Sequence, residues 1–213
     1  MTANQEDYLK MIYELGGYGG QVTNKQIAEG LHVSAASVSE MLQKLVKDGY
    51  IIYTPYKGIQ LTKSGATKAA SLLRKHRLWE VFLVEHLQYS WSDVDEVAEL
   101  LEHVTSNDLA DRLERYLDYP PVCPHGSPIP YEARYLEDAS IPLAALNQGQ
   151  KAVIRRVVDE KELLDYLNRL GIKIGDVVEV VTIEPYEGPM ILNIGHDRTI
   201  SMSYKAAQSI YCY

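Results

Sequence analysis

The sequence of 213 residues is poor in the features that mark secreted and membrane proteins. It has two cysteines, Cys123 and Cys212, which are too few for a disulfide framework and suit a reducing compartment. No segment approaches the roughly 18 consecutive apolar residues of a membrane span, and the opening MTANQEDYLK lacks the basic and then apolar order of a signal peptide. We therefore expect a cytoplasmic protein without a membrane partner.

Basic residues are also scarce, since 21 Lys and Arg stand against 29 Asp and Glu and give a net charge of -8. This balance argues against nucleic acid as a partner, because phosphate binding requires a basic surface. The charge is unevenly distributed, however: residues 1–75 carry a net charge of +3 and residues 76–213 a net charge of -11. A nucleic-acid-binding surface is therefore expected only in the first third of the chain.

That first third has the pattern of a helix-turn-helix. The spacing of apolar residues predicts a helix over residues 5–15. Thr23 begins a capping box that opens a short helix ending at Gly30, and Ser34 caps a third helix that extends to about Lys47. Two short helices joined by a tight turn, the second opening with small residues, have the geometry needed for insertion into the major groove of DNA.

A hairpin follows these helices. Two β-rich runs, residues 50–53 and 59–62, flank a turn that contains Pro and Gly, which predicts the wing of a winged helix-turn-helix. The side chains expected to contact phosphates or bases lie on the third helix and the hairpin: Ser34, Ala35, Ala36, Ser37, Ser39, Gln43, Lys44, Tyr56 and Lys57. A fragment of a helical bundle with an appended hairpin is the alternative that the pattern leaves open.

The remainder of the chain changes from helical to proline-rich and then to β-rich. Helices are predicted over residues 64–87, 92–104 and 106–117, each beginning at a serine that can cap it. Six prolines mark residues 118–150 as an extended linker. Strands predicted at 153–158, 177–183, 190–194 and 199–202, with a helix at 160–170, favour a small, mainly antiparallel barrel.

Three groups of side chains could hold a metal ion. Glu99, Glu102 and His103 share one helical face and bring together two oxygen donors and one imidazole. His76 and Glu80 repeat this arrangement on the preceding long helix, and Cys123 and His125 form a softer pair in a loop stiffened by proline. The alternatives are solvated charged faces for the helical groups and a surface loop with a free thiol for the last.

Five stretches, taken in this order, resemble the diphtheria toxin repressor family of metalloregulators, and most closely its manganese-responsive streptococcal and enterococcal members. They are EDYLKMIYEL at 6–15, NKQIAEGLHVSAASVSEMLQKL at 24–45, RKHRLWEVFL at 74–83, LLEHVTSNDLADRLE at 100–114 and YPPVCPHGSPIP at 119–130. The resemblance spans the chain and implies a mainly α fold with a small β domain. The implied domains are a winged helix-turn-helix at 1–72, a helical dimerisation and metal-binding domain with a Pro-rich linker at 73–140, and an SH3-like (FeoA-like) barrel at 141–213.

The resemblance also implies two metal sites. The primary, activating site looks like Asp7, Glu99, Glu102 and His103, with His76 placed to join it or to bridge toward the second site. The ancillary site looks like Glu80, Cys123 and His125 together with one carboxylate from the C-terminal domain, either Glu160 or, as the alternative, Asp159. The C-terminal domain would thus donate a ligand and steady the dimer.

Departures from the family pattern bear on the metal. Iron-responsive relatives carry Met and Cys where this sequence has Asp7 and Glu99, and hard carboxylates favour Mn²⁺ over Fe²⁺. Fe²⁺ remains the alternative cofactor, and Zn²⁺, Cd²⁺ or Co²⁺ would substitute in vitro. Lys10 stands where some manganese-responsive relatives have a second carboxylate, which argues against their two-metal cluster.

The implied function is that of a homodimeric repressor that binds palindromic operator DNA, as one or two dimers per operator, and controls metal-uptake genes. Because Asp7 lies on the first helix and Glu102 and His103 on the dimerisation helices, one ion would hold both parts together. An iron-responsive regulator of the same family is the nearest alternative. A metalloenzyme that activates water and a metal-independent DNA-binding or protein-interaction module are alternatives from other classes.

Overall fold

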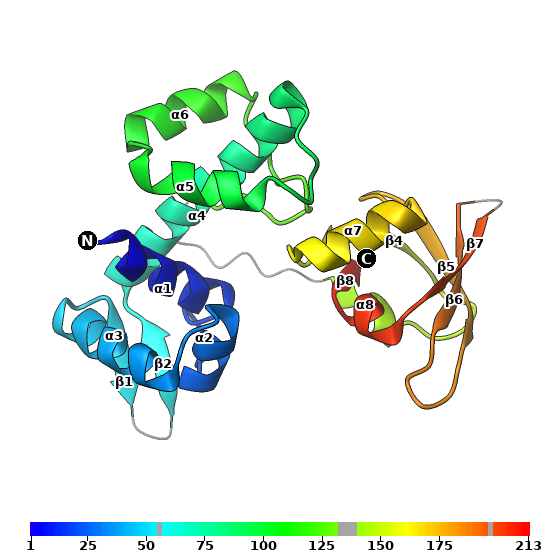
Figure 1. Cartoon of the computed structure of the whole chain (residues 1–213), viewed down its shortest axis with the longest axis horizontal. Coiled ribbons are helices and arrows are strands. Elements are labelled where there is room, and N and C mark those ends of the chain that lie inside the picture. Colours follow the sequence, from blue (N-terminus) through cyan, green and yellow to red (C-terminus); the bar gives the residue numbers. More distant parts are fainter. Residues whose placement is uncertain (55–56, 132–139, 196–197) are drawn as a thin grey trace. The chain divides into compact units, whose positions relative to one another are not determined.

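The structure is a computed structural model that describes residues 1–54, 57–131, 140–195 and 198–213. Of these, residues 1–79, 98–119 and 129–131 form one compact unit, and residues 80–97, 120–128 and 140–213 form a second. Figure 1 shows the helical first unit and the sheet of the second. The long helix α4 (Lys63–Leu87) contributes to both units, so the predicted domain boundary after residue 72 lies inside one continuous helix.

The first unit begins with the predicted helix-turn-helix. Helix α1 (Ala3–Glu14) and helix α2 (Asn24–Gly30) each start at a reciprocal capping box, formed by Thr2 with Gln5 and by Thr23 with Gln26. The side chain of Ser34 caps α3 (Ala35–Lys47) by accepting a hydrogen bond from the amide of Ser37. The predicted start of each of the last two helices is therefore confirmed by its cap.

The wing is also confirmed. Strands β1 (Ile51–Thr54) and β2 (Gly58–Leu61) pair antiparallel, from Ile51 opposite Leu61 to Thr54 opposite Gly58. Gly58 has a φ of +98°, and a Cβ there would lie 2.8 Å from the carbonyl oxygen of Val22, so glycine alone fits. The hairpin and the three helices enclose one apolar core, whose fully buried members include Ile12, Ile27, Val38, Leu45 and Ile59.

Two helices follow α4, namely α5 (Asp95–Val104) and α6 (Asn107–Tyr116). The predicted cap of α6 is confirmed, because the side chain of Ser106 accepts from the amide of Leu109. The start predicted for α5 at Ser92 is wrong, because the helix begins three residues later. Ser92 is hydrogen-bonded instead to the hydroxyl of Ser90, in a turn that competes with helix formation. Among the described residues, each helix is too short or too polar to cross a bilayer.

The second unit contains an antiparallel sheet with the strand order β3-β8-β4-β5-β6-β7. Its strands are β3 (Ile141–Pro142), β4 (Lys151–Val157), β5 (Val177–Ile183), β6 (Met190–Ile194), β7 (Arg198–Met202) and β8 (Ile210–Cys212). Helix α7 (Lys161–Leu170) follows β4, and α8 (Tyr204–Gln208) precedes β8. The predicted small β domain is therefore confirmed.

The sequence pattern missed four elements of this unit. Residues 118–150 are not wholly a linker, because β3 and a turn of 3-10 helix, Leu143–Ala145, lie within them and Leu143 is fully buried. Helix α8 and strand β8 were not predicted either. All of these elements have two to five residues, too few to show a period. Pro142 is tolerated because β3 is an edge strand.

Candidate metal centre

The first unit brings together donors from three helices. Asp7 of α1 and Glu102 and His103 of α5 each place a ligand atom within 4.8 Å of the others. Nδ1 of His76, from α4, lies 2.6 Å from Oε2 of Glu102, whose side chain is fully buried. We call these four residues the His103 cluster. Two carboxylates and two imidazoles in this arrangement can coordinate a divalent cation.

The orientation of His103 favours metal coordination. Its Nδ1 lies 2.8 Å from Oε2 of Glu6, and its Nε2 lies 3.0 Å from Oδ1 of Asp7. A neutral ring that donates its Nδ1 proton to Glu6 turns the Nε2 lone pair toward Asp7, as in the carboxylate–histidine–metal arrangement of many metalloproteins. Among the described residues, Oδ1 of Asp7 is buried and accepts no hydrogen bond of acceptable geometry. The cluster therefore fits a cation.

The electrostatics of the cluster agree with this fit. Burial raises the pKa of Asp7 above its usual value, although His103 and Lys10 act in the opposite direction. Nζ of Lys10 lies 2.7 and 2.9 Å from the two carboxylate oxygens of Glu102. Burial alone would lower the pKa of Lys10, but Glu102 raises it above the usual value, so the side chain is an ammonium. The carboxylates of Asp7 and Glu102 therefore lie in an environment where positive charge stabilises them.

Glu99, predicted as a ligand of the primary site, is placed differently. It is exposed, and among the described residues it is not one of those whose ligand atoms come within 4.8 Å of one another. Its charge nevertheless raises the pKa of Asp7. Glu99 therefore lies one helical turn from the cluster, on the same side of α5 as His103.

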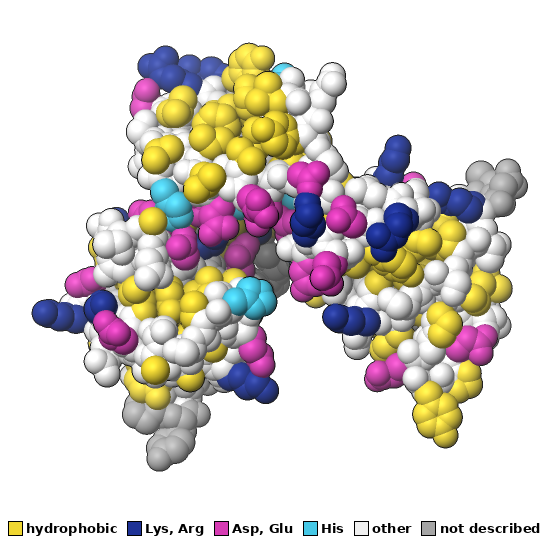
Figure 2. Space-filling view, in the orientation of Figure 1, with side chains coloured by type: hydrophobic (Ala, Val, Ile, Leu, Met, Phe, Trp, Pro, Cys, Tyr) yellow, Lys and Arg dark blue, Asp and Glu magenta, His cyan; other side chains and the backbone are white. Residues whose placement is uncertain are grey.

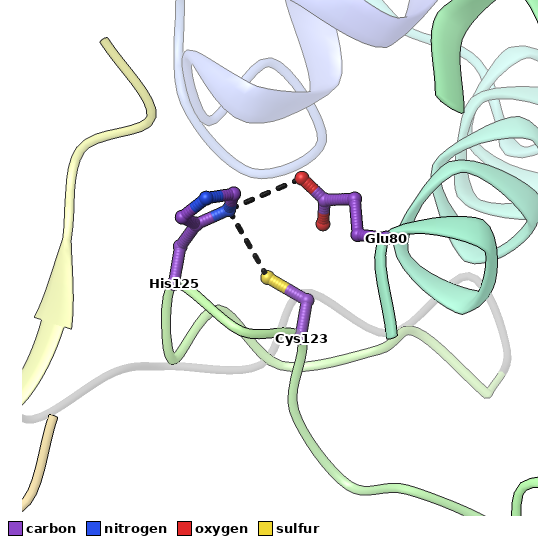
Figure 3. Close-up of side chains that lie close together, drawn as sticks. All are labelled: Glu80, Cys123 and His125. Atoms are coloured by element: carbon purple, nitrogen blue, oxygen red, sulfur yellow. Dashed lines mark hydrogen bonds and ion pairs between the residues drawn. The ribbon is translucent and has the colours of Figure 1, made fainter. Parts of the chain in front are cut away.

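The second unit holds another cluster, drawn in Figure 3. Glu80 of α4, Cys123 and His125 are buried, and their ligand atoms lie within 4.8 Å of one another. Nδ1 of His125 is 3.1 Å from Oε1 of Glu80, 3.9 Å from Sγ of Cys123 and 3.3 Å from Oδ2 of Asp159. We call these four residues the His125 cluster. Cys123 and His125 are two residues apart, whereas Glu80 and Asp159 come from distant parts of the sequence.

The loop that carries Cys123 and His125 is held tightly. The amide of Cys123 donates to the carbonyl of Ser127, and the amide of Gly126 donates to the carbonyl of Cys123. Gly126 has a φ of +81°, and a Cβ there would collide with the carbonyl oxygen of Arg155 on β4. The amide of Val157 also donates to the carbonyl of His125. The loop is therefore fixed against β4.

The protonation of this cluster reflects the carboxylates around His125. Nε2 of His125 lies 2.7 Å from the carbonyl oxygen of Trp91, to which it donates. Burial lowers the pKa of His125, but the hydrogen bond with Cys123 and the carboxylates of Glu80 and Asp159 raise it overall to about 11. Burial raises the pKa of Asp159 to about 7. A divalent cation would replace the proton on Nδ1, because metal ligands bind deprotonated.

The two alternatives for the carboxylate of the C-terminal domain are separated by their positions. Both residues are exposed, but Oδ2 of Asp159, two residues after the end of β4, lies 3.3 Å from Nδ1 of His125. Glu160 is the N-cap residue of α7 and makes no capping hydrogen bond. The structure brings Asp159, and not Glu160, into the His125 cluster. Asp95 was missed by the sequence analysis, although one of its oxygens lies within 4.8 Å of ligand atoms of Glu80 and Asp159.

The predicted DNA-contacting residues of α3 share an exposed face. Ser34, Ala35, Ala36, Ser37, Ser39, Gln43 and Lys44 are all exposed, as is Lys57 at the wing. The hydroxyl of Ser39 donates to the carbonyl of Ala35, and Lys44 pairs with Glu40 at 2.8 Å. Asn24 and Tyr53 line a hollow on this face together with Ser39 and Gln43, and they were not predicted. Tyr56 lies outside the described residues.

Helices α5 and α6 expose an apolar surface. Leu100 and Val104 are 74% and 78% exposed and lie one turn apart on α5, and Leu109, Tyr116 and Tyr119 are exposed on and after α6. Figure 2 shows hydrophobic side chains gathered over these helices. An apolar surface of this kind on a protein of this size is typical of a subunit interface. We call Leu100, Val104, Leu109 and Tyr116 the α5–α6 face.

A winged helix-turn-helix, helices with an exposed apolar face and clusters of metal-binding side chains together define the class of metal-dependent, dimeric DNA-binding regulators. Family models agree: residues 1–59 match the N-terminal DNA binding domain of iron dependent repressors, residues 62–131 their metal binding and dimerisation domain, and residues 141–213 the FeoA domain. The chain belongs to the diphtheria toxin repressor family of metal-dependent transcriptional repressors. This family consists of regulators and not of enzymes, so the chain is not an enzyme.

Individual relatives support this assignment. The HTH-type transcriptional regulator MntR of Lysinibacillus sphaericus is 35% identical over 53% of this chain and 93% of its own length. A solved structure described as a manganese-dependent transcriptional repressor in complex with manganese is 31% identical, with a TM-score of 0.89 over 98% of each chain. The structure of the manganese regulator SloR is 38% identical, with a TM-score of 0.83 over 100% of this chain and 99% of that one.

Proposed function

We propose that this chain is a repressor activated by Mn²⁺, which binds palindromic operator DNA as a homodimer and controls metal-uptake genes. The His103 cluster carries the proposal, because Asp7 comes from the helix-turn-helix and Glu102 and His103 come from a helix of the dimerisation region. A bound divalent ion would supply positive charge to the carboxylates of Asp7 and Glu102. Asp7 and Glu102 would then be held together, which restricts how the DNA-binding helices move relative to the dimer interface.

This restriction matters because of the geometry of DNA. A dimer reads two half-sites only when its recognition helices are spaced by about one helical turn, roughly 34 Å, or a multiple of it. Holding α1 against α5 raises the fraction of molecules with competent spacing, and the apparent affinity for DNA rises with that fraction. The proposed contacts to DNA come from the exposed face of α3 and from the wing.

The donor set supports manganese. Asp7, Glu102, His76 and His103 offer oxygen and nitrogen only, a set that suits Mn²⁺, whereas sulfur ligands favour softer metals. Glu99, one turn away on α5, stays in the proposed ligand set. The two solved relatives are described as manganese regulators, while the family models are named for iron. Fe²⁺ is therefore the alternative activator, and Zn²⁺, Cd²⁺ or Co²⁺ would bind in vitro.

A selection experiment tests the proposal. Random-sequence duplexes are selected on the full-length protein with Mn²⁺, and the enriched duplex is then titrated by fluorescence anisotropy with Mn²⁺, with Fe²⁺ under anaerobic conditions, and with excess chelator. We expect a palindromic sequence whose binding is lost with chelator and restored by Mn²⁺. Binding that persists in chelator would contradict the proposal. Light scattering of the complex decides between one and two dimers per operator.

The His125 cluster is proposed as a supporting site, and its cysteine provides a prediction. Replacing Cys123 by alanine should raise the Mn²⁺ concentration for half-maximal operator binding about tenfold without abolishing activation, because one ligand of a supporting site is removed. The other cysteine is a matched control: Cys212→Ala removes a buried thiol from β8, far along the chain from any donor. Complete loss of activation in the Cys123 variant alone would mean that the His125 cluster is the activating site.

A further inference from the structure

One residue of the first unit occupies an unusual place for a cation. Lys10 extends from α1, three residues after Asp7, and its side chain is only 14% exposed. Its ammonium contacts both carboxylate oxygens of Glu102, at 2.7 and 2.9 Å. Glu102 is fully buried, and it is the carboxylate that α5 contributes to the His103 cluster. Lys10 is therefore a cation that pairs with Glu102 inside the cluster.

The remaining contacts of Glu102 show what this means for a metal ion. Oε2 lies 2.6 Å from Nδ1 of His76, and Oε1 lies 3.6 Å from Nε2 of His103. Both oxygens accept from the ammonium of Lys10, and Oε2 also has a ring-nitrogen partner. A carboxylate buried to this degree is costly without a cation beside it. A metal ion coordinated by Glu102 would therefore compete with the ammonium of Lys10 for the same two oxygens.

We propose that Lys10 is an internal competitor of the metal, which occupies Glu102 in the metal-free protein and must be displaced before Glu102 coordinates. The inference rests on the proposed function. It adds that Lys10, a residue of α1, helps to set the metal concentration at which the protein is activated. The apparent metal affinity equals the intrinsic affinity multiplied by the fraction of molecules in which Lys10 does not hold Glu102.

A different role for Lys10 would change the metal affinity in the opposite direction when Lys10 is replaced. If the ammonium stayed beside the bound ion and balanced the charges of Asp7, Glu99 and Glu102, its removal would weaken metal binding. If the ammonium competes for Glu102, its removal strengthens metal binding. The sign of the change in affinity therefore decides between competition and charge balance.

The chain offers a matched control for the long-range effect of a positive charge. Lys75 is on α4, next to His76, and its charge interacts with the carboxylates of Glu6 and Glu102. Within the described part of the chain, however, Lys75 forms no ion pair or hydrogen bond with Glu102. Lys75→Met therefore removes a nearby charge without freeing Glu102, whereas Lys10→Met does both.

The test measures Mn²⁺ binding directly, without DNA. Full-length protein is stripped with chelator and titrated with Mn²⁺ in competition with a fluorescent indicator. We expect Lys10→Met, which keeps the apolar stem, to bind Mn²⁺ about tenfold more tightly, the equivalent of a coupling of about 1.4 kcal/mol. Lys10→Arg, which retains the charge, and Lys75→Met should each bind Mn²⁺ like the wild type.

Thermal unfolding provides a second readout that does not depend on activation. Lys10→Met should lower the melting temperature of the metal-free protein, because Glu102 loses its cation, and saturating Mn²⁺ should remove that deficit. Lys10→Gln, neutral but still a hydrogen-bond donor, serves as a second variant if Lys10→Met folds poorly. Equal or weaker Mn²⁺ binding in both neutral variants would overturn the inference.

The controls separate this inference from the proposed function. Glu102→Gln should lose the Mn²⁺ site in the wild-type background. If wild type and Glu102→Gln bind Mn²⁺ alike, the proposed function of the His103 cluster fails, and the inference fails with it. If Glu102→Gln loses the site while Lys10→Met matches the wild type, only the role of Lys10 is overturned.

Discussion

Replacing His103 by alanine is expected to abolish Mn²⁺-dependent operator binding while leaving a folded dimer. The substitution removes an imidazole whose Nε2 faces Asp7 and whose Nδ1 faces Glu6, and so it disconnects α5 from α1 at the cluster. Loss of groups that merely orient metal ligands typically costs 10- to 100-fold in affinity, so we expect at least about a 100-fold loss for a ligand itself. Fluorescence anisotropy with the selected duplex and a Mn²⁺ titration measures it.

A matched histidine controls for the loss of an imidazole. His86 lies on α4, where its ring stacks on Phe82 with centroids 5.4 Å apart, and it belongs to neither cluster. His86→Ala should retain Mn²⁺-dependent operator binding. Light scattering and circular dichroism establish that both variants are folded dimers. Unchanged activation in His103→Ala would remove the basis for assigning the primary site to this cluster.

Placing aspartates on the α5–α6 face should abolish operator binding as well, in this case by preventing dimer formation. Leu100→Asp combined with Val104→Asp introduces two charges on side chains that are 74% and 78% exposed in the single chain. If this face is buried in the dimer, those charges lose their hydration on association, a cost of several kcal/mol per unpaired charge. We therefore expect a monomer that does not bind the operator at any Mn²⁺ concentration.

The control uses an exposed apolar side chain outside that face. Val177 is 47% exposed on β5, so Val177→Asp introduces a charge without touching α5 or α6. Light scattering should give a dimer for this variant and a monomer for the double variant, with similar circular dichroism spectra. A double variant that remains dimeric would move the subunit interface to another surface.

The parts of the fold that sequence could predict are those decided locally. Thr23 and Ser34 cap α2 and α3 because a side-chain oxygen can reach an amide three residues on, which depends on nothing distant. The start of α5 was predicted wrongly because it depends on more than the residue type at the cap position. Ser92 has the same residue type as a cap, but it is engaged by Ser90 in a turn, and no local pattern distinguishes the two outcomes.

The same distinction applies to the metal-binding residues. Glu102 and His103 could be recognised by their spacing, because both belong to one helix. Asp7 entered only through the resemblance to a family, and Glu6 was missed, because each contact with His103 joins residues 96 or 97 positions apart. Glu160 was preferred to Asp159 because adjacent carboxylates cannot be ranked without knowing which one lies beyond the end of β4 and faces His125.

The glycine of the Cys-Pro-His-Gly turn has a consequence for how this protein can vary in nature. Any side chain at position 126 would strike the carbonyl of Arg155 and move the loop away from β4. The fold should therefore tolerate replacement of one metal-binding side chain of the His125 cluster by another, for example sulfur by oxygen, more readily than replacement of this glycine. Among sequence variants of the chain, we expect glycine to be kept at position 126 even where Cys123 is replaced by another residue.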